Sequence, residues 1–306
     1  MQHTSSSNRS KNHSRGRWGI HKKKDQGENE VNSILLQNFK KYAEELDDKH
    51  DRYERIIKIS RDITIESKRI IFLLHTIDIK KGNSDKVLAE AKHRLQNLFA
   101  NQFYLIAKEL HKMDAYQYSR AYSAGLQEFI EAFSFYEYLN KSNLSSWEII
   151  QNHLKFDINV DVENIENKIE SENMKNIELA NTETKNTIVS CLVQPTEYIL
   201  GLADVSGELM RRCINSLGVG DIEVCFECCR VLQIFFTGFV GLDTFRQRDL
   251  ARKISTLRQS VLKTEQVCYN IKVRGSEAAL LGAGGEATYL SFVGEENDKI
   301  DEDYFD

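Results

Sequence analysis

Apolar residues recur at helical spacing along the first part of the chain, from residue 32 to about residue 80. Two series with a period of seven residues interleave here: Phe39, Leu46 and Tyr53, and Ile56, Ile63, Ile70 and Ile77. The stretch contains no glycine and no proline. Such a pattern is typical of an amphipathic α-helix. The sequence therefore predicts one very long N-terminal helix, about 70 Å at 1.5 Å per residue.

Helical periodicity continues after Gly82, and no stretch shows the alternation expected of a strand. Pro195 suits the first turn of a helix, and Gly218 suits the residue just past a helix end. The further predicted helices cover about residues 84–113, 115–139, 146–152, 195–217, 221–239 and 245–273. We therefore expect an all-α fold, an elongated bundle of about seven helices with a very long N-terminal helix.

Changes in composition divide the chain into three parts. Residues 1–30 are polar and basic and are expected to be disordered, with Lys22, Lys23 and Lys24 as the densest positive point. This segment is either a solubilising tail or an arm for nuclear import or RNA contact. Residues 31–280 form the predicted helical domain, within which 152–190 is expected to be an acidic, mobile insertion. Residues 281–306 form an acidic tail.

Overall composition limits the classes of function. The chain of 306 residues carries a net charge of −5, so any nucleic-acid surface must be local. No run of 18 apolar residues is present, which predicts no membrane span. The N-terminus lacks the apolar core of a signal peptide, so the six cysteines are expected to be reduced thiols inside the cell. Cys225, Cys228 and Cys229 lack a second zinc-spaced pair and are interpreted as packing residues.

Two acids on the predicted helix over residues 115–139 lie in apolar surroundings. Glu128 and Glu131 fall about 60° apart on a helical wheel, with Phe135 between them. The opposite face, which contains Phe129 and Ile130, is apolar as well. A helix that is apolar on every side is usually covered on both sides. Covered carboxylates must be paired, protonated or bound to a metal.

A second pair of acids, Asp204 and Glu208, lies four residues apart on the helix that begins at Pro195. Taken alone, this pair and the adjacent Arg211 and Arg212 are most simply an exposed network of ion pairs. If the two helices pack face to face, four carboxylates converge, and they cannot share a buried site without a cation. Oxygen ligands favour Mg²⁺ or Mn²⁺, and an acidic Mg²⁺ site suits phosphoryl chemistry. The pattern leaves both interpretations open.

The long first helix also carries repeated positive charge, including Arg61, Lys68 and Arg69. These residues either form a solvated face with acidic neighbours or contact the phosphates of an RNA backbone.

Four stretches of this sequence, in order along the chain, resemble the translin family: DRYERIIKISRDITIESKRIIFLLH, GLQEFIEAFSF, YILGLADVSGELMRRCINSLGVGDIE and CYNIKVRGSE. The similarity runs from about residue 33 to residue 277, apart from the insertion. The resemblance implies an all-α fold of seven helices and a partner, translin, in a closed hetero-octamer. It also implies that Lys22, Lys23 and Lys24 are the counterpart of a nuclear-import segment, so we expect both cytoplasmic and nuclear locations.

The family resemblance further implies an activity, Mg²⁺-dependent cleavage of single-stranded RNA. In the family this endoribonuclease activates the RNA-silencing complex by removing the passenger strand, and it is implicated in processing tRNA precursors. The residues that match the family's catalytic and metal-binding carboxylates are Glu128, Glu131, Asp204 and Glu208. Two rival hypotheses remain, an all-α nucleoside-triphosphate pyrophosphohydrolase and a non-catalytic scaffold that binds translin.

Overall fold

The computed structural model describes residues 34–78, 81–141, 143–158, 187–245 and 247–280. The basic segment 1–30, with Lys22, Lys23 and Lys24, lies outside these residues, as does the acidic tail. The chain divides into two units, residues 1–48 and residues 49–306. In the first unit, residues 36–48 are helical and exposed, including the apolar side chains of Leu36, Phe39 and Leu46.

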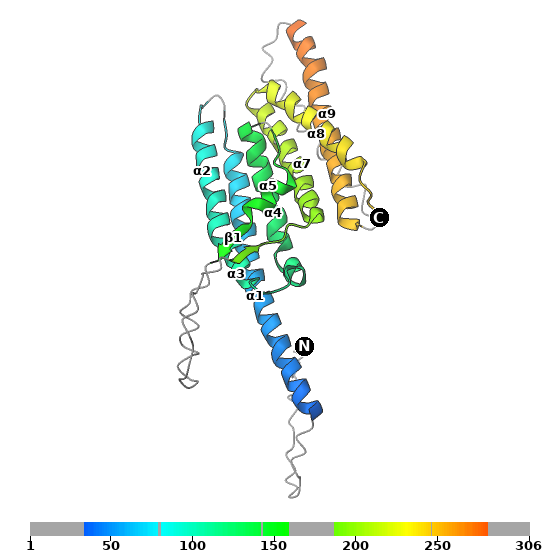
Figure 1. Ribbon diagram of the computed structural model, residues 1–306. Coiled ribbons are helices and arrows are strands. Elements are labelled where there is room, and N and C mark those ends of the chain that lie inside the picture. Colours follow the sequence, from blue (N-terminus) through cyan, green and yellow to red (C-terminus); the bar gives the residue numbers. More distant parts are fainter. Residues whose placement is uncertain (1–33, 79–80, 142, 159–186, 246, 281–306) are drawn as a thin grey trace, which may run out of the picture. The chain divides into compact units, whose positions relative to one another are not determined.

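Helices make up most of the described chain (Figure 1). The elements in order are α1 (Ile34–Leu74), α2 (Ser84–Asn97), a π-helical turn (Leu98–Phe103), α3 (Tyr104–Glu109), α4 (Ala115–Lys141), α5 (Trp147–His153), β1 (Lys155–Ile158), β2 (Thr187–Ser190), α7 (Pro195–Gly218), α8 (Ile222–Val240) and α9 (Arg248–Leu280). The all-α prediction is confirmed. Among the described residues, no helix is long and apolar enough to cross a membrane.

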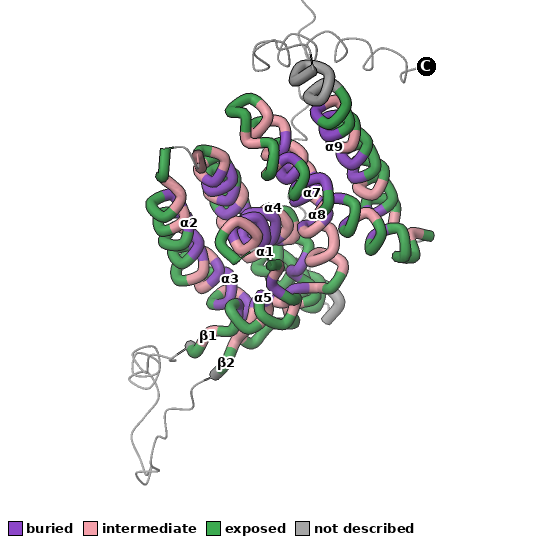
Figure 2. The backbone as a smooth tube through the Cα atoms, turned by 90° about the horizontal axis from the view of Figure 1, so that it is seen from above, coloured by how far each residue is buried: buried purple, intermediate pink, exposed green. Residues whose placement is uncertain are grey.

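Helix α4 is the most deeply buried element of the second unit (Figure 2). Residues 129–136 of α4 are all buried, which confirms that this helix is covered on both sides. Phe129, Ala132 and Phe135 have no exposed surface, although they point in different directions around the helix. The second apolar series of α1 packs into the same core, where Ile56, Ile63, Ile70 and Leu74 are fully buried.

The first predicted helix ends earlier than its apolar series suggested. Helix α1 stops at Leu74 rather than near residue 80 because side chains bond to the backbone beyond it. The hydroxyl of Thr76 donates to the Leu73 carbonyl at 2.7 Å, and the amide of Asn83 donates to the Thr76 carbonyl at 2.9 Å. Asn83 also accepts a 2.8 Å hydrogen bond from the Asp78 amide, which fixes the chain in a loop.

The expectation of no strands was wrong. Residues 155–158 and 187–190 pair as a short antiparallel ladder, with Phe156 opposite Val189. Helix α5 and this ladder occupy both ends of the predicted insertion, and residues 159–186 lie outside the described chain. Four-residue strands are too short to give a clear alternation in the sequence.

Two glycines let neighbouring helices approach α4 closely. A Cβ placed on Gly125 would lie 2.6 Å from the carbonyl oxygen of Ser60 on α1. A Cβ on Gly201 would lie 2.7 Å from the carbonyl oxygen of Gln127 on α4. Each glycine precedes a candidate acid by three residues, Glu128 in one case and Asp204 in the other. These two contacts set the distances at which α1 and α7 approach the centre of the bundle.

Candidate carboxylate site

The four candidate acids lie at the junction of α4 and α7, which pack directly against each other. Glu128 and Glu131 come from α4, and Asp204 and Glu208 come from α7. Both acids of α7 are close enough to Glu131 to disfavour its charged form. The face-to-face packing that the sequence left conditional is therefore present.

Glu131 is the buried centre of this group. Only 8% of the residue is exposed, and among the described residues its carboxylate has no hydrogen bond or ion pair. Burial, together with the negative charges of Asp204, Glu208 and Glu128, raises the pKa of Glu131 to about 8, against a smaller opposite effect of Lys253. The surrounding protein thus disfavours the ionised form of this carboxyl.

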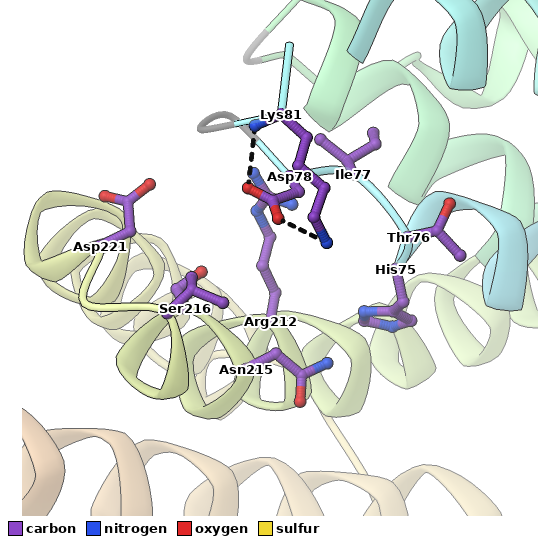
Figure 3. Close-up of a pocket in the computed structure, with 10 residues that line it drawn as sticks. His75, Thr76, Ile77, Asp78, Lys81, Arg212, Asn215, Ser216 and Asp221 are labelled. Atoms are coloured by element: carbon purple, nitrogen blue, oxygen red, sulfur yellow. Dashed lines mark hydrogen bonds and ion pairs between the residues drawn. The ribbon is translucent and has the colours of Figure 1, made fainter. Parts of the chain in front are cut away.

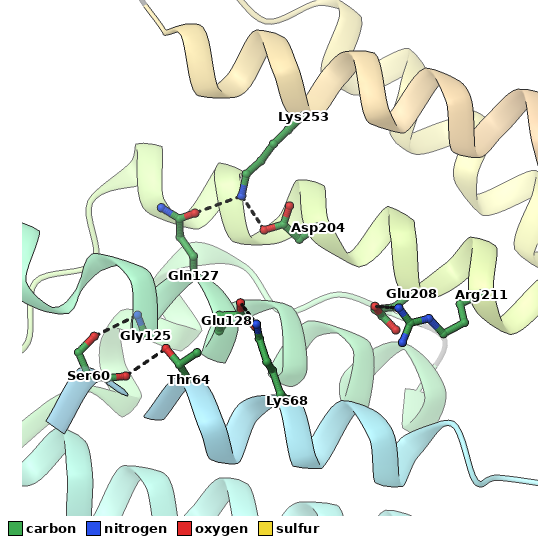
Figure 4. Close-up of polar contacts among 10 residues, drawn as sticks. All are labelled: Ser60, Thr64, Lys68, Gly125, Gln127, Glu128, Asp204, Glu208, Arg211 and Lys253. Carbon is green, nitrogen blue, oxygen red and sulfur yellow. Dashed lines mark hydrogen bonds and ion pairs between the residues drawn. The ribbon is translucent and has the colours of Figure 1, made fainter. Parts of the chain in front are cut away.

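Each of the three outer acids is paired with cationic groups of the chain. The ammonium of Lys68 on α1 lies 3.1 Å from Glu128, and that of Lys253 on α9 lies 2.5 Å from Asp204 (Figure 4). Glu208 lies 2.5 Å from Nε2 of His75 and 3.5 Å from Arg211. Arg211 was expected to form an exposed ion pair with these acids, but Glu208 itself is buried.

Lys253 and His75 belong to the site although no pattern in the sequence pointed to them. The ammonium of Lys253 donates to Gln127 on α4 and to the Leu200 carbonyl, both at 3.1 Å, in addition to its ion pair with Asp204. Lys253 therefore ties α9 to both helices that carry the acids. The rings of His75 and Phe135 contact each other in a tilted arrangement, with centroids 5.0 Å apart. Phe135 consequently supports the histidine that faces Glu208.

The donor atoms suit a hard divalent cation, but their present arrangement is not a ligand cage. Among the described residues, no three His, Cys, Asp or Glu side chains converge in a geometry that could hold a metal ion. The outer carboxylates point to lysine, histidine and arginine instead of to a common centre. Four carboxylates around a buried site nevertheless have the chemistry that Mg²⁺ or Mn²⁺ requires, and a cation there would offset the repulsion at Glu131.

Comparison with known proteins agrees with this geometry. The sequence profile of the translin family matches residues 51–275, a range that includes all four acids. The chain belongs to the translin family. It is 39% identical over 245 residues to Translin-associated protein X of Rattus norvegicus, which covers 80% of this chain and 81% of that protein. Translin-associated protein X of Mus musculus is 38% identical over 247 residues.

A solved structure agrees with the translin-family fold. The crystal structure of apo-NeC3PO superposes with a TM-score of 0.51 at 20% identity, covering 76% of this chain and 95% of that chain. At this level of identity the similarity supports the helical fold and carries no information about activity.

Other side chains selected from the sequence lie outside the acid group of this translin-family chain. Arg61 is exposed on α1, and Arg69 pairs with Glu66 at 3.3 Å. Lys68 is the exception, because its ammonium faces Glu128 within the acid group. The cysteines of α8 are buried in a separate cluster with Cys213 and Cys268, in agreement with their interpretation as packing residues.

Proposed function

We propose that this chain is the catalytic subunit of a translin-containing, Mg²⁺-dependent endoribonuclease that cleaves single-stranded RNA. The observation that carries the proposal is the buried carboxyl of Glu131 with three further carboxylates around it, in a member of the translin family. A group of this kind is costly to bury and is typical of a site that binds a cation. Membership of the translin family, for which the sequence resemblance implied cleavage of single-stranded RNA, supports the choice of RNA as substrate.

The residues that would hold Mg²⁺ or Mn²⁺ are Glu128, Glu131, Asp204 and Glu208. A bound divalent cation supplies Lewis-acid activation of a phosphodiester and of water. The chain itself positions the acids through rigid helices and holds the outer three on Lys68, Lys253 and His75 until a cation competes for them. Lys253 keeps Asp204 in register with α4 through its bond to Gln127.

The proposal includes a cellular role. The subunit would assemble with translin, as a hetero-octamer, and activate the RNA-silencing complex by removing passenger strands, with tRNA precursors as further substrates. It would act in the cytoplasm and nucleus. Arg61, Lys68 and Arg69 would contribute to RNA binding along α1, and Lys22, Lys23 and Lys24 would serve in nuclear import.

The replacement Asp204→Asn tests the assignment. This change keeps the shape of the side chain but removes one negative ligand, so cleavage of a 5′-labelled single-stranded RNA in Mg²⁺ should fall by at least about a hundredfold. The assembled complex should keep its size on gel filtration. Asp249→Asn is the matched control, because Asp249 is exposed on α9 and, among the described residues, pairs with Arg252 alone. Wild-type cleavage by a correctly assembled Asp204→Asn complex would refute the nuclease assignment.

A non-catalytic scaffold is the second candidate, and the ion pairs of the outer acids favour it. Under this hypothesis the acids serve only to hold α1, α7 and α9 against α4. Binding of Mn²⁺ to the complex, measured by electron paramagnetic resonance, separates the two candidates. A scaffold shows no Mn²⁺ binding that depends on Glu131. The same samples incubated with nucleoside triphosphates would test the pyrophosphohydrolase alternative through release of pyrophosphate.

A further inference from the structure

A cavity of about 310 Å³ with several polar side chains in its wall lies next to the carboxylate site, between the loop after α1 and the C-terminal half of α7 (Figure 3). His75 lines this cavity, and the same residue contacts Glu208, so the cavity and the acids share one wall. Helix α7 contributes Arg212, Asn215 and Ser216, which point into the space. Arg212 follows Glu208 by one helical turn, about 6 Å along the axis.

The acids of this cavity already have partners. Asp78 pairs with the ammonium of Lys81 at 3.1 Å and accepts from the Lys81 amide at 3.3 Å. Asp221 caps α8 by accepting from the Val224 amide at 3.3 Å. Neither carboxylate is therefore available as the main recognition group for a ligand. What the cavity offers to a ligand are the groups on α7.

The side chains of Arg212, Asn215 and Ser216 on α7 carry hydrogen-bond donors that have no acceptor within the described chain. Among the residues that the structure describes, the guanidinium of Arg212 has no hydrogen bond or ion pair, although the residue is half-buried. The side chains of Asn215 and Ser216 likewise have none within the described chain. A guanidinium presents several N–H groups in a planar fork that matches two oxygens of a phosphate. An amide and a hydroxyl beside it complete a site for an anion with several oxygens.

We propose that Arg212, Asn215 and Ser216 form a subsite for a backbone phosphate of single-stranded RNA, one nucleotide away from the phosphate at the carboxylates. This inference rests on the proposed function, because the occupant is a neighbouring part of the same substrate. The subsite positions the strand along α7 so that the next phosphodiester lies at Glu131 and Asp204. It reads the sugar-phosphate backbone and not the base, so its contribution is independent of sequence.

RNA binding without cleavage tests the subsite. The full-length chain assembled with translin is kept in EDTA, and its affinity for a fluorescein-labelled single-stranded RNA is measured by anisotropy at several KCl concentrations. The slope of log K against log salt is negative, and loss of one phosphate contact should reduce its magnitude by about 0.7. Arg212→Gln should show this decrease and bind about tenfold more weakly at low salt. The matched control is Arg230→Gln, since Arg230 is exposed on α8 and pairs with Glu227.

A second variant and a modified RNA distinguish phosphate contact from a general loss of structure. Arg212→Lys keeps the charge and loses the fork, so its salt slope should stay near that of the wild type while affinity falls. Single phosphates of the RNA are then replaced in turn by uncharged methylphosphonates. The wild type should lose affinity when the phosphate bound by Arg212 is replaced, and Arg212→Gln should lose no further affinity at that position. Inorganic phosphate at millimolar concentration should not displace the RNA. This result would show that the subsite prefers a phosphate of the RNA backbone to free phosphate.

The outcomes separate the subsite from the nuclease assignment. An unchanged salt slope in Arg212→Gln, or an equal change in Arg230→Gln, would overturn the subsite and leave the Asp204→Asn cleavage result as it stands. Active Asp204→Asn with a reduced slope in Arg212→Gln would overturn the nuclease assignment and support the phosphate contact. A wild-type complex that binds no RNA in EDTA would contradict the subsite.

Discussion

Replacing Gly201 by alanine should destabilise the fold, whereas the same replacement at Gly207, six residues further along α7, should stabilise it. A Cβ at Gly201 would lie 2.7 Å from the Gln127 carbonyl oxygen and 2.8 Å from the Cβ of Ile130. Both atoms are fixed to the backbone of α4, so they cannot swing aside as the end of a flexible side chain would. A Cβ at Gly207 meets nothing within 4 Å.

The expected magnitudes follow from these two environments. In the interior of a helix, alanine is favoured over glycine by about 1 kcal/mol at either position. Overpacking at Gly201 opposes this gain by about 1–3 kcal/mol, because α7 must shift away from α4. The free energies of unfolding of the two variants should therefore differ by about 1–3 kcal/mol. The helix-propensity contribution cancels in that difference, which isolates the close approach at Gly201.

Urea unfolding followed by far-ultraviolet circular dichroism measures this difference, with both variants in the same oligomeric state. Gly201 precedes Asp204 by three residues, so a shift of α7 also moves Asp204 relative to Glu131. We expect RNA cleavage to fall in Gly201→Ala and to remain unchanged in Gly207→Ala. Equal stabilities for the two variants would refute the argument that the contact between α4 and α7 depends on a missing side chain.

Two further predictions concern the charges at the site. The pKa of Glu131 is raised from 4.5 to about 8 in the folded chain. As pH rises, the unfolded chain therefore loses the Glu131 carboxyl proton before the folded chain does. The free energy of unfolding should fall by about 3–5 kcal/mol between pH 4.5 and pH 8. Urea titrations in EDTA at pH 5 and pH 8 should show this fall in the wild type but not in Glu131→Gln. If the falls in the two proteins differ by less than about 1 kcal/mol, the burial argument is contradicted. Lys253→Met should lower stability in EDTA by about 1–2 kcal/mol, since Asp204 and Gln127 lose their shared partner. Equal thermal melting of Lys253→Met and wild type would show that this contact contributes nothing.

The sequence predicted the helices well because their patterns are long. The series of Ile56, Ile63 and Ile70 on α1 and the apolar surroundings of Glu131 describe side chains that are buried in the structure, whereas Phe39 and Leu46 of the other series are exposed. The end of α1 was placed too late because Ile77 continues the apolar series, while the bonds that end the helix come from Thr76 and Asn83. Local competition between side chain and backbone is not visible in hydrophobic periodicity.

The composition of the site was only partly predictable for a related reason. The four acids share helical spacing and could be selected in pairs. Lys253 and His75 lie far from these acids in the sequence, on α9 and at the C-terminal end of α1, and they reach the site only through the packing of four helices. The pairing of Lys68 with Glu128 was not predicted, since a positive charge on an exposed helix gives no indication of which acid faces it.

With the proposed function, Lys68, Lys253 and Arg211 explain how one chain can keep four carboxylates together and still bind a metal. Without compensation, mutual repulsion at the junction of α4 and α7 would oppose the packing that creates the site. Lys68 and Lys253 supply that compensation from helices outside the acid pairs, Arg211 supplies it beside Glu208 on α7, and only Glu131 is left without a partner in the described chain. In the proposed function, Glu131 would bind a cation without giving up an ion pair, whereas the outer acids would have to leave theirs. The metal affinity of the site would then depend on competition with the protein's own cations.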